Sequence, residues 1–268
     1  MSGVIFQANG LITLTTDFGL SDPYVGVMKG AILTRYPAAR LVDLTHQVPA
    51  FQPVLAGFWL SRVWPHSPPG TVHLAVVDPG VGTERGMVAL QASGQLFVAP
   101  DDGLLDPVFR SAPQAQWRLF HLSDLRHLGL SSSSHTFHGR DIFAPLVAET
   151  AAGRQSPDSL GTCVQPQVDA PPQPLGHGRI VCADHYGNLI TDIQAGDLAH
   201  FKQPVLAFRG RQIPLFVSYG FAPPGELLAL VNSWDTLEIA LAQGSAQQLL
   251  QAGSGEVVTL VESPLPMA

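Results

Sequence analysis

The sequence is poor in charged residues. Only 13% of its 268 residues are charged, and the 14 basic residues are scattered singly, so no arginine- or lysine-rich run is present to neutralise a nucleic acid backbone. The 21 acidic residues give a net charge of −7, which favours solubility and identifies no substrate. We therefore expect no nucleic acid partner.

Cysteine and long apolar runs are also scarce. The two cysteines, Cys163 and Cys182, form no C-x-x-C motif, which excludes a cysteine-based zinc site and a disulfide scaffold and favours a reducing compartment. No run reaches the ~18 apolar residues of a membrane span. The first ten residues lack a basic region followed by a long apolar core. We expect a cytoplasmic protein with no membrane association.

Several common signatures of catalysis are missing from the sequence. It contains no G-x-S-x-G elbow, no Walker loop and no G-x-G-x-x-G fingerprint. A metal site built from Asp17, Asp43, His46 and Asp78 is conceivable, because carboxylate and imidazole groups bind cations. No H-x-x-x-H or D-x-D spacing supports that site, so the expectation is no metal.

Apolar residues make up 46% of the chain, which is typical of a protein with a substantial core. In the first part, strand-like runs alternate with helix-like runs, and this alternation predicts βαβ units and a mostly parallel sheet. Strands are expected at residues 11–16, 39–46, 71–77 and 95–100, and helices at 24–33, 54–64 and 139–153.

A proline-rich stretch, VDAPPQPLG at residues 168–176, interrupts this alternation and predicts a stiff, extended connection. The runs beyond it are short and punctuated by glycine and proline, which favours an antiparallel barrel or sandwich. We predict an α/β domain over residues 1–168 with a mostly parallel sheet, followed by a smaller all-β barrel domain over residues 176–268.

Polar residues follow several of the predicted strands. In an open parallel sheet, ligands bind beyond the carboxyl ends of the strands. Asp17, Asp43 and Asp78 lie at or near such ends. VVDPGVGTER adds Arg85 after a glycine-rich turn, and TFHGRDIF places His138 before the third predicted helix. Two interpretations are open: turn-forming residues with a structural salt bridge, or a polar active site at one sheet edge. The joint occurrence of these residues favours the site.

Six sequence blocks occur in the order and spacing of a known family: TLTTDFGLSDPYVGVMKGAI, VVDPGVGTER, PDDGLL, TFHGRDIFAP, DHYGNLIT and NSWDTLEIA. Across residues 11–262 the chain resembles the S-adenosyl-L-methionine (SAM) hydroxide adenosyltransferases, or adenosine-forming SAM hydrolases, which are similar to the fluorinase and the chlorinase. The resemblance implies an α/β domain, a β-barrel domain and a homotrimer with active sites between subunits. It also implies cleavage of SAM at C5′ into adenosine and L-methionine by water-derived hydroxide, without metal or cofactor.

The resemblance further implies roles for individual residues. It places Asp78, Arg85 and His138 around the attacking water as the catalytic set. The implied substrate-binding residues are Asp17 at the ribose hydroxyls, Asp22 nearby, Gly139 where the fluorinase has a halide-binding serine, Asp184 near the amino-acid end, Tyr186 over the base, Asn188 at adenine, Ser233 at the carboxylate and Glu238 in the adenine-side segment. From the residues alone, Asp184 and Asn188 fit a hairpin turn equally well.

Four positions depart from the family pattern. Asp102 and Asp192 stand where asparagine is expected, Tyr186 replaces phenylalanine, and Trp234 follows Ser233 where the halogenases have arginine. None belongs to the catalytic set. Two alternatives to a hydrolase remain open: a halogenase-like adenosyl halide synthase, and a SAM- or adenosine-binding module with incidental turnover.

Overall fold

The computed structural model describes residues 5–112, 114–130, 134–166 and 174–263. The chain divides into two compact units, Met1–Asp169 and Ala170–Ala268. The domain boundary was predicted from the proline-rich stretch, and most of that stretch lies at residues 167–173, outside the described residues. Within the described parts of the chain, no helix is long and apolar enough to cross a membrane.

The first unit is built on a seven-stranded sheet with the order β2-β1-β3-β5-β4-β6-β7. Neighbours from β2 to β5 are parallel, β4 runs antiparallel between β5 and β6, and β7 is antiparallel to β6. The strands are β1 (Leu11–Thr16), β2 (Arg40–Thr45), β3 (Val72–Val76), β4 (Met87–Ala92), β5 (Gln95–Pro100), β6 (Gln116–Phe120) and β7 (Thr162–Val164). The α/β prediction is confirmed, and the sheet is mixed.

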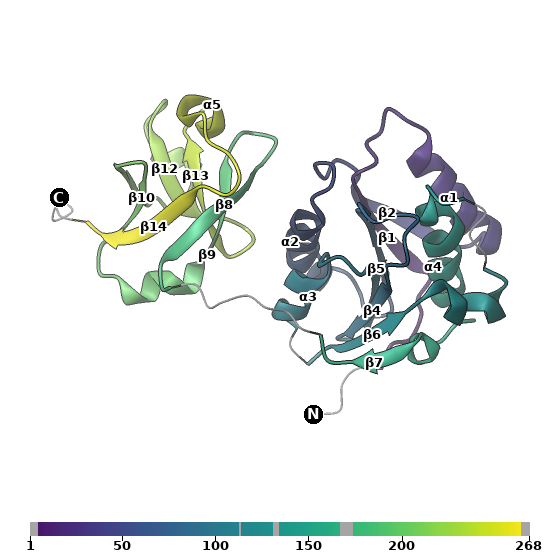
Figure 1. Ribbon diagram of the computed structural model, residues 1–268. Coiled ribbons are helices and arrows are strands. Elements are labelled where there is room, and N and C mark those ends of the chain that lie inside the picture. Colours follow the sequence, from purple (N-terminus) through teal and green to yellow (C-terminus); the bar gives the residue numbers. More distant parts are fainter. Residues whose placement is uncertain (1–4, 113, 131–133, 167–173, 264–268) are drawn as a thin grey trace. The chain divides into compact units, whose positions relative to one another are not determined.

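Helices cover both faces of this sheet (Figure 1). One face carries α1 (Tyr24–Arg35) and α4 (Ala144–Ala151), and the other carries α2 (Pro53–Val63) and α3 (Asp106–Ser111). Every residue of β3 is buried, as expected for a strand that faces a core on each side. Leu74 packs in the core with α1 and α4, and Ala75 packs in the core with α2 and α3.

Three strands, β4, β6 and β7, were absent from the expectation based on sequence. β4 and β5 form a hairpin whose turn residues Ser93 and Gly94 both have positive φ, at 49° and 74°. Positive φ at both central residues matches the right-handed twist of the paired strands. This hairpin reverses the chain direction and makes the sheet mixed.

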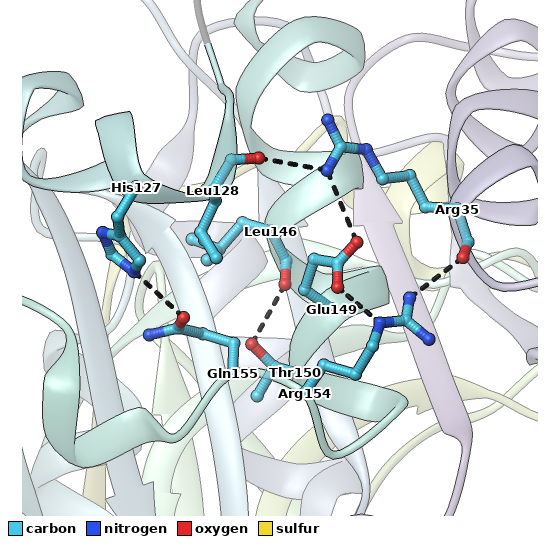
Figure 2. A network of polar contacts seen from close by, with 8 residues as sticks. All are labelled: Arg35, His127, Leu128, Leu146, Glu149, Thr150, Arg154 and Gln155. Atoms are coloured by element: carbon cyan, nitrogen blue, oxygen red, sulfur yellow. Dashed lines mark hydrogen bonds and ion pairs between the residues drawn. The ribbon is translucent and has the colours of Figure 1, made fainter.

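A charged network joins the end of α1 to the end of α4 (Figure 2). Arg35 donates to Glu149 at 3.4 Å and to the Leu128 carbonyl at 3.3 Å. Arg154 donates to the other oxygen of Glu149 at 2.6 Å and to the Arg35 carbonyl at 2.9 Å. Glu149 therefore bridges two guanidinium groups and holds the two helices together on their face of the sheet.

The second unit is an antiparallel sheet with the order β11-β10-β14-β8-β9-β13-β12. A bridge between Leu215 and Ala229 connects the segment after β11 to β12, so the sheet nearly closes into a barrel. Its elements are β8 (His177–Ala183), β9 (Leu189–Gln194), β10 (Pro204–Phe208), β11 (Arg211–Pro214), β12 (Leu227–Val231), β13 (Thr236–Leu241), α5 (Ala246–Leu250) and β14 (Val257–Glu262). The core inside includes Leu206, Phe208 and Ile239.

Candidate active site

A buried ion pair stands just beyond the carboxyl end of β3. Arg85 Nε donates to Asp78 Oδ1 at 2.6 Å, and Arg85 Nη2 donates to Asp78 Oδ2, so the contact is bidentate. The Arg85 and Asp78 side chains are only 11% and 5% exposed. A bidentate pair fixes the plane of the guanidinium, and burial makes the loss of either partner costly.

The backbone geometry of the turn between Asp78 and Arg85 requires glycine. Gly82 has a φ of +82°, and a Cβ there would lie 2.3 Å from the His135 carbonyl oxygen. Only glycine fits such a conformation and such a close approach. The turn therefore brings Arg85 back onto Asp78 while the segment before His138 passes directly against it.

His138 completes the polar cluster. Its Nδ1 lies 3.4 Å from Arg85 Nη2, and the residue is 8% exposed. Burial, followed by the positive charge of Arg85, lowers the pKa of His138, against the opposing effect of Asp78 and Asp141. Because a guanidinium only donates, the contact fits an imidazole with an unprotonated Nδ1. Such a group is able to accept a proton at neutral pH.

The helix that follows His138 differs from the prediction. A single helix was expected over residues 139–153, but Gly139–Phe143 forms a wider π-helical turn, and α4 begins only at Ala144. The Ala144 amide donates to the Gly139 carbonyl, five residues earlier. Single π-helical turns inside helices occur frequently at functional sites.

Aromatic rings form a wall beside the cluster. Phe18, Tyr24 and Phe137 meet edge to face, with ring centroids 5.4–6.3 Å apart. A Cβ on Gly139 would lie 3.2 Å from Phe18 and 3.3 Å from Phe137. The Arg85 guanidinium lies over the Phe143 ring at 5.5 Å. The cluster is thus bordered by apolar surface, where charges are poorly screened.

Three other acidic residues singled out in the sequence, Asp17, Asp22 and Asp43, have separate surroundings. Asp17 directly follows β1, and its Oδ2 accepts the Phe51 amide at 3.1 Å. Asp22 is exposed. Asp43 lies inside β2 and pairs with Lys29 at 2.6 Å and His46 at 3.1 Å. Among the described residues, no group of three or more His, Cys, Asp or Glu side chains is arranged to hold a metal ion.

In the second unit, Asp184 organises the turn between β8 and β9. Its Oδ1 accepts the amides of Tyr186 and Asn188, both at 2.9 Å, and its Oδ2 accepts the Asn188 side-chain amide at 3.0 Å. This is the hairpin-turn arrangement that the sequence allowed. The turn leaves Tyr186 exposed, with its ring open to solvent.

A second polar group is centred on Glu238, which lies within β13. Glu238 is 2% exposed and accepts the Tyr219 hydroxyl at 2.5 Å. Burial raises the pKa of Glu238, while hydrogen bonds from Tyr219 and Asn232 oppose the shift. Ser233 is exposed in the turn that joins the two strands, and the Trp234 amide is held by Asn232 Oδ1 at 3.0 Å.

Sequence reasoning missed Tyr219 as a partner of Glu238. It noted Asp102 only as a departure from the family pattern, yet this residue lies beside the Asp78–Arg85 pair: the charges of both act on its carboxyl group. The only feature of the sequence that could have pointed to Asp102 was the pair of acidic residues in PDDGLL, directly after a predicted strand.

An α/β unit with a polar cluster at the carboxyl end of a parallel strand, followed in the chain by an antiparallel β unit, is a two-unit α/β protein with a polar site where open α/β sheets bind their ligands. Residues 12–161 match the family model of the SAM hydroxide adenosyltransferase N-terminal domain, and residues 178–259 match that of the C-terminal domain. The chain therefore belongs to the SAM hydroxide adenosyltransferase family, which confirms the resemblance found in the six sequence blocks.

Individual relatives agree with this assignment. An (R)-S-adenosyl-L-methionine hydrolase of Thermus thermophilus is 36% identical over 92% of this chain and 97% of its own length. The protein of that name in Salinispora tropica is 34% identical over 91% and 95%. A fluorinase of an Actinoplanes species is more distant, at 25% identity over 72% and 74%. A solved structure of an uncharacterized conserved protein from Thermotoga maritima superposes with a TM-score of 0.85, at 32% identity over 93% and 100%.

Proposed function

We propose that this protein hydrolyses SAM to adenosine and L-methionine by in-line attack of a water-derived hydroxide on C5′. The family membership and the hydrolase relatives support the reaction. The observation that carries the mechanism is the Asp78–Arg85–His138 cluster, in which a buried carboxylate orients a guanidinium against an imidazole of lowered pKa.

The cluster activates the nucleophile, which is the difficult part of this reaction. A sulfonium is already a good leaving group, whereas neutral water attacks carbon slowly. His138 accepts the proton of the water, and Arg85 stabilises the hydroxide that forms. Asp78 holds Arg85 in plane and balances its charge. Hydroxide and sulfonium neutralise each other in the transition state, so the apolar wall assists the attack by excluding water from both ions.

The substrate contacts are proposed from the family pattern. In the first unit, Asp17 binds the ribose hydroxyls through acceptor oxygens, Asp22 lies near the same loop, and Gly139 occupies the position of the fluorinase's halide-binding serine. The second unit supplies Asp184, Tyr186, Asn188, Ser233 and Glu238 for adenine and methionine. Separate binding of ribose, base and amino acid would align C5′ for attack, a type of effect worth ~7–11 kcal/mol.

Three further properties belong to this proposal. As the family resemblance implies, the reaction uses no metal and no cofactor, and SAM is the substrate. The protein acts in the cytoplasm and interacts with neither nucleic acid nor membrane. It assembles as a homotrimer, as the family resemblance implies, and light scattering of the purified protein would test this.

One experiment tests the function. Purified protein is incubated with SAM in water labelled with heavy oxygen, with and without EDTA and chloride, and the products are identified by mass spectrometry. We expect adenosine carrying solvent oxygen at the 5′ position, together with methionine, in every condition. A chlorinated nucleoside would instead identify an adenosyl halide synthase. Loss of activity in EDTA with rescue by a divalent ion would contradict the metal-free mechanism.

A further inference from the structure

Asp102 is a carboxyl group at the same sheet edge for which the proposed reaction has no role. It follows β5, and its Oδ1 accepts the Leu104 amide at 3.2 Å. Its Oδ2 is buried and has no hydrogen-bond partner within the part of the chain that the structure describes. A buried carboxylate oxygen without a donor is costly when charged, so this environment favours the protonated acid.

The loop that carries Asp102 is tied to Arg85 through one backbone oxygen. The Gly86 carbonyl accepts Arg85 Nη1 at 3.2 Å and the Asp101 amide at 3.1 Å. A Cβ on Gly86 would lie 3.4 Å from a carboxylate oxygen of Asp101, so the loop and the residue after Arg85 are in close contact. The residue next to Asp102 is therefore held against the backbone oxygen that Arg85 also contacts.

Three charged groups act on Asp102. Burial is the largest effect, and together with the nearby charges of Asp78 and Asp101 it raises the pKa of Asp102 to about 7 despite two opposing effects. The Leu104 amide and the positive charge of Arg85 lower it. The carboxyl group of Asp102 therefore changes its charge within the pH range in which the enzyme is proposed to act, well above the ordinary range of an aspartate.

We propose that Asp102 is a positioning residue for the reaction: in its uncharged form it leaves Arg85 directed at Asp78 and the nucleophile. This inference rests on the proposed function of Asp78, Arg85 and His138. An ionised Asp102 gives the guanidinium a second carboxylate and adds negative charge where hydroxide must form. Both effects oppose the attack, so the neutral form is the active one.

The pH profile of turnover tests this role, with Asp102→Asn as a neutral group of the same shape. Asp106→Asn is the matched control: burial also raises the pKa of Asp106, but its charged neighbours are Arg110 and Asp101. We expect kcat of the wild type, relative to Asp102→Asn, to fall by about tenfold between about pH 6 and about pH 8, with KM little changed. Parallel profiles of these two proteins, or the same change in Asp106→Asn, would overturn the proposal.

A second measurement does not depend on turnover. Carbon NMR spectra of protein labelled at the aspartate carboxyl carbons are recorded against pH, and the resonance missing from Asp102→Asn identifies this group. We expect it to titrate near neutrality; titration near the ordinary value of ~3.9 would refute the inference even in an active hydrolase. If the protein releases no adenosine from SAM, the proposed function fails, and the NMR titration still decides whether Asp102 is held neutral.

Discussion

Replacement of Arg85 by lysine distinguishes a catalytic ion pair from a structural one. Arg85 makes two parallel hydrogen bonds to Asp78, approaches His138 at 3.4 Å and lies over Phe143. Lysine keeps the positive charge but, as a compact ammonium, cannot reproduce the planar fork. At least one charge-assisted hydrogen bond is lost, and each is worth ~1.5–3 kcal/mol.

This loss sets the size of the expected effect. If the hydrogen bond matters in the transition state, kcat/KM for SAM falls by ~10- to 150-fold in Arg85→Lys, because 1.36 kcal/mol corresponds to tenfold in rate. The assay is adenosine release, normalised to the folded fraction measured by circular dichroism. Arg209→Lys is the matched control, since Arg209 also pairs with a carboxylate, Glu256, and lies over a phenylalanine, but it belongs to the second unit and is half exposed.

Two results would refute the reasoning. If Arg85→Lys lowers the melting temperature and keeps full activity per folded molecule, Asp78 and Arg85 only stabilise the turn. If Arg209→Lys loses as much activity as Arg85→Lys, the effect is not specific to the site. A loss confined to Arg85→Lys supports the proposed stabilisation of hydroxide.

Three further predictions concern His138, Asp17 and His73. His138→Ala should slow turnover by ~10²–10⁴-fold, the usual cost of losing a general base, while calorimetry still detects adenosine binding; unchanged turnover would remove His138 from the reaction. Asp17→Ala should weaken adenosine binding far more than Asp17→Asn, and equal affinities would contradict the ribose contact. Burial lowers the pKa of His73 to about 4, so this histidine binds a proton more readily in the unfolded chain than in the folded one. The free energy of unfolding should therefore fall by about 3 kcal/mol as the pH is lowered from about 6.5 towards 4. Urea titrations at several pH values measure this fall, and the same fall in His73→Gln would contradict the prediction.

The sequence was most informative where one local pattern determines the structure. β3 reads as a continuous apolar run and is buried throughout, because a central strand with helices on both faces meets no water. The turn of VVDPGVGTER was also predictable as a turn, since Gly82 adopts the positive φ that favours glycine. Family resemblance then led to Asp78, Arg85 and His138, and the structure places these three side chains in contact.

Prediction failed where long-range packing decides the outcome. The run before Gln95 gave no clear strand signal by itself, and β4 is stabilised by pairing with β5 and β6 on its two sides. The π-helical turn Gly139–Phe143 similarly depends on its surroundings, because Phe18 and Phe137 crowd Gly139 from outside the helix. Neither the strand pairing of β4 nor the crowding at Gly139 can be inferred from the local propensities of the sequence.

Asp102 illustrates why a site can extend beyond its recognisable motifs. In the sequence, PDDGLL reads as a polar turn after a strand, and a solvated aspartate there would be ionised. The parallel pairing of β3 with β5 brings the ends of these strands to one edge, where the carboxyl group of Asp102 is buried near Asp78 and Arg85. Its chemistry thus arises from the burial and neighbours that strand order creates. By the same reasoning, the asparagine expected at this position would remove the titration and leave the shape of the loop intact, so the Asp102→Asn variant separates the effect of charge from that of packing.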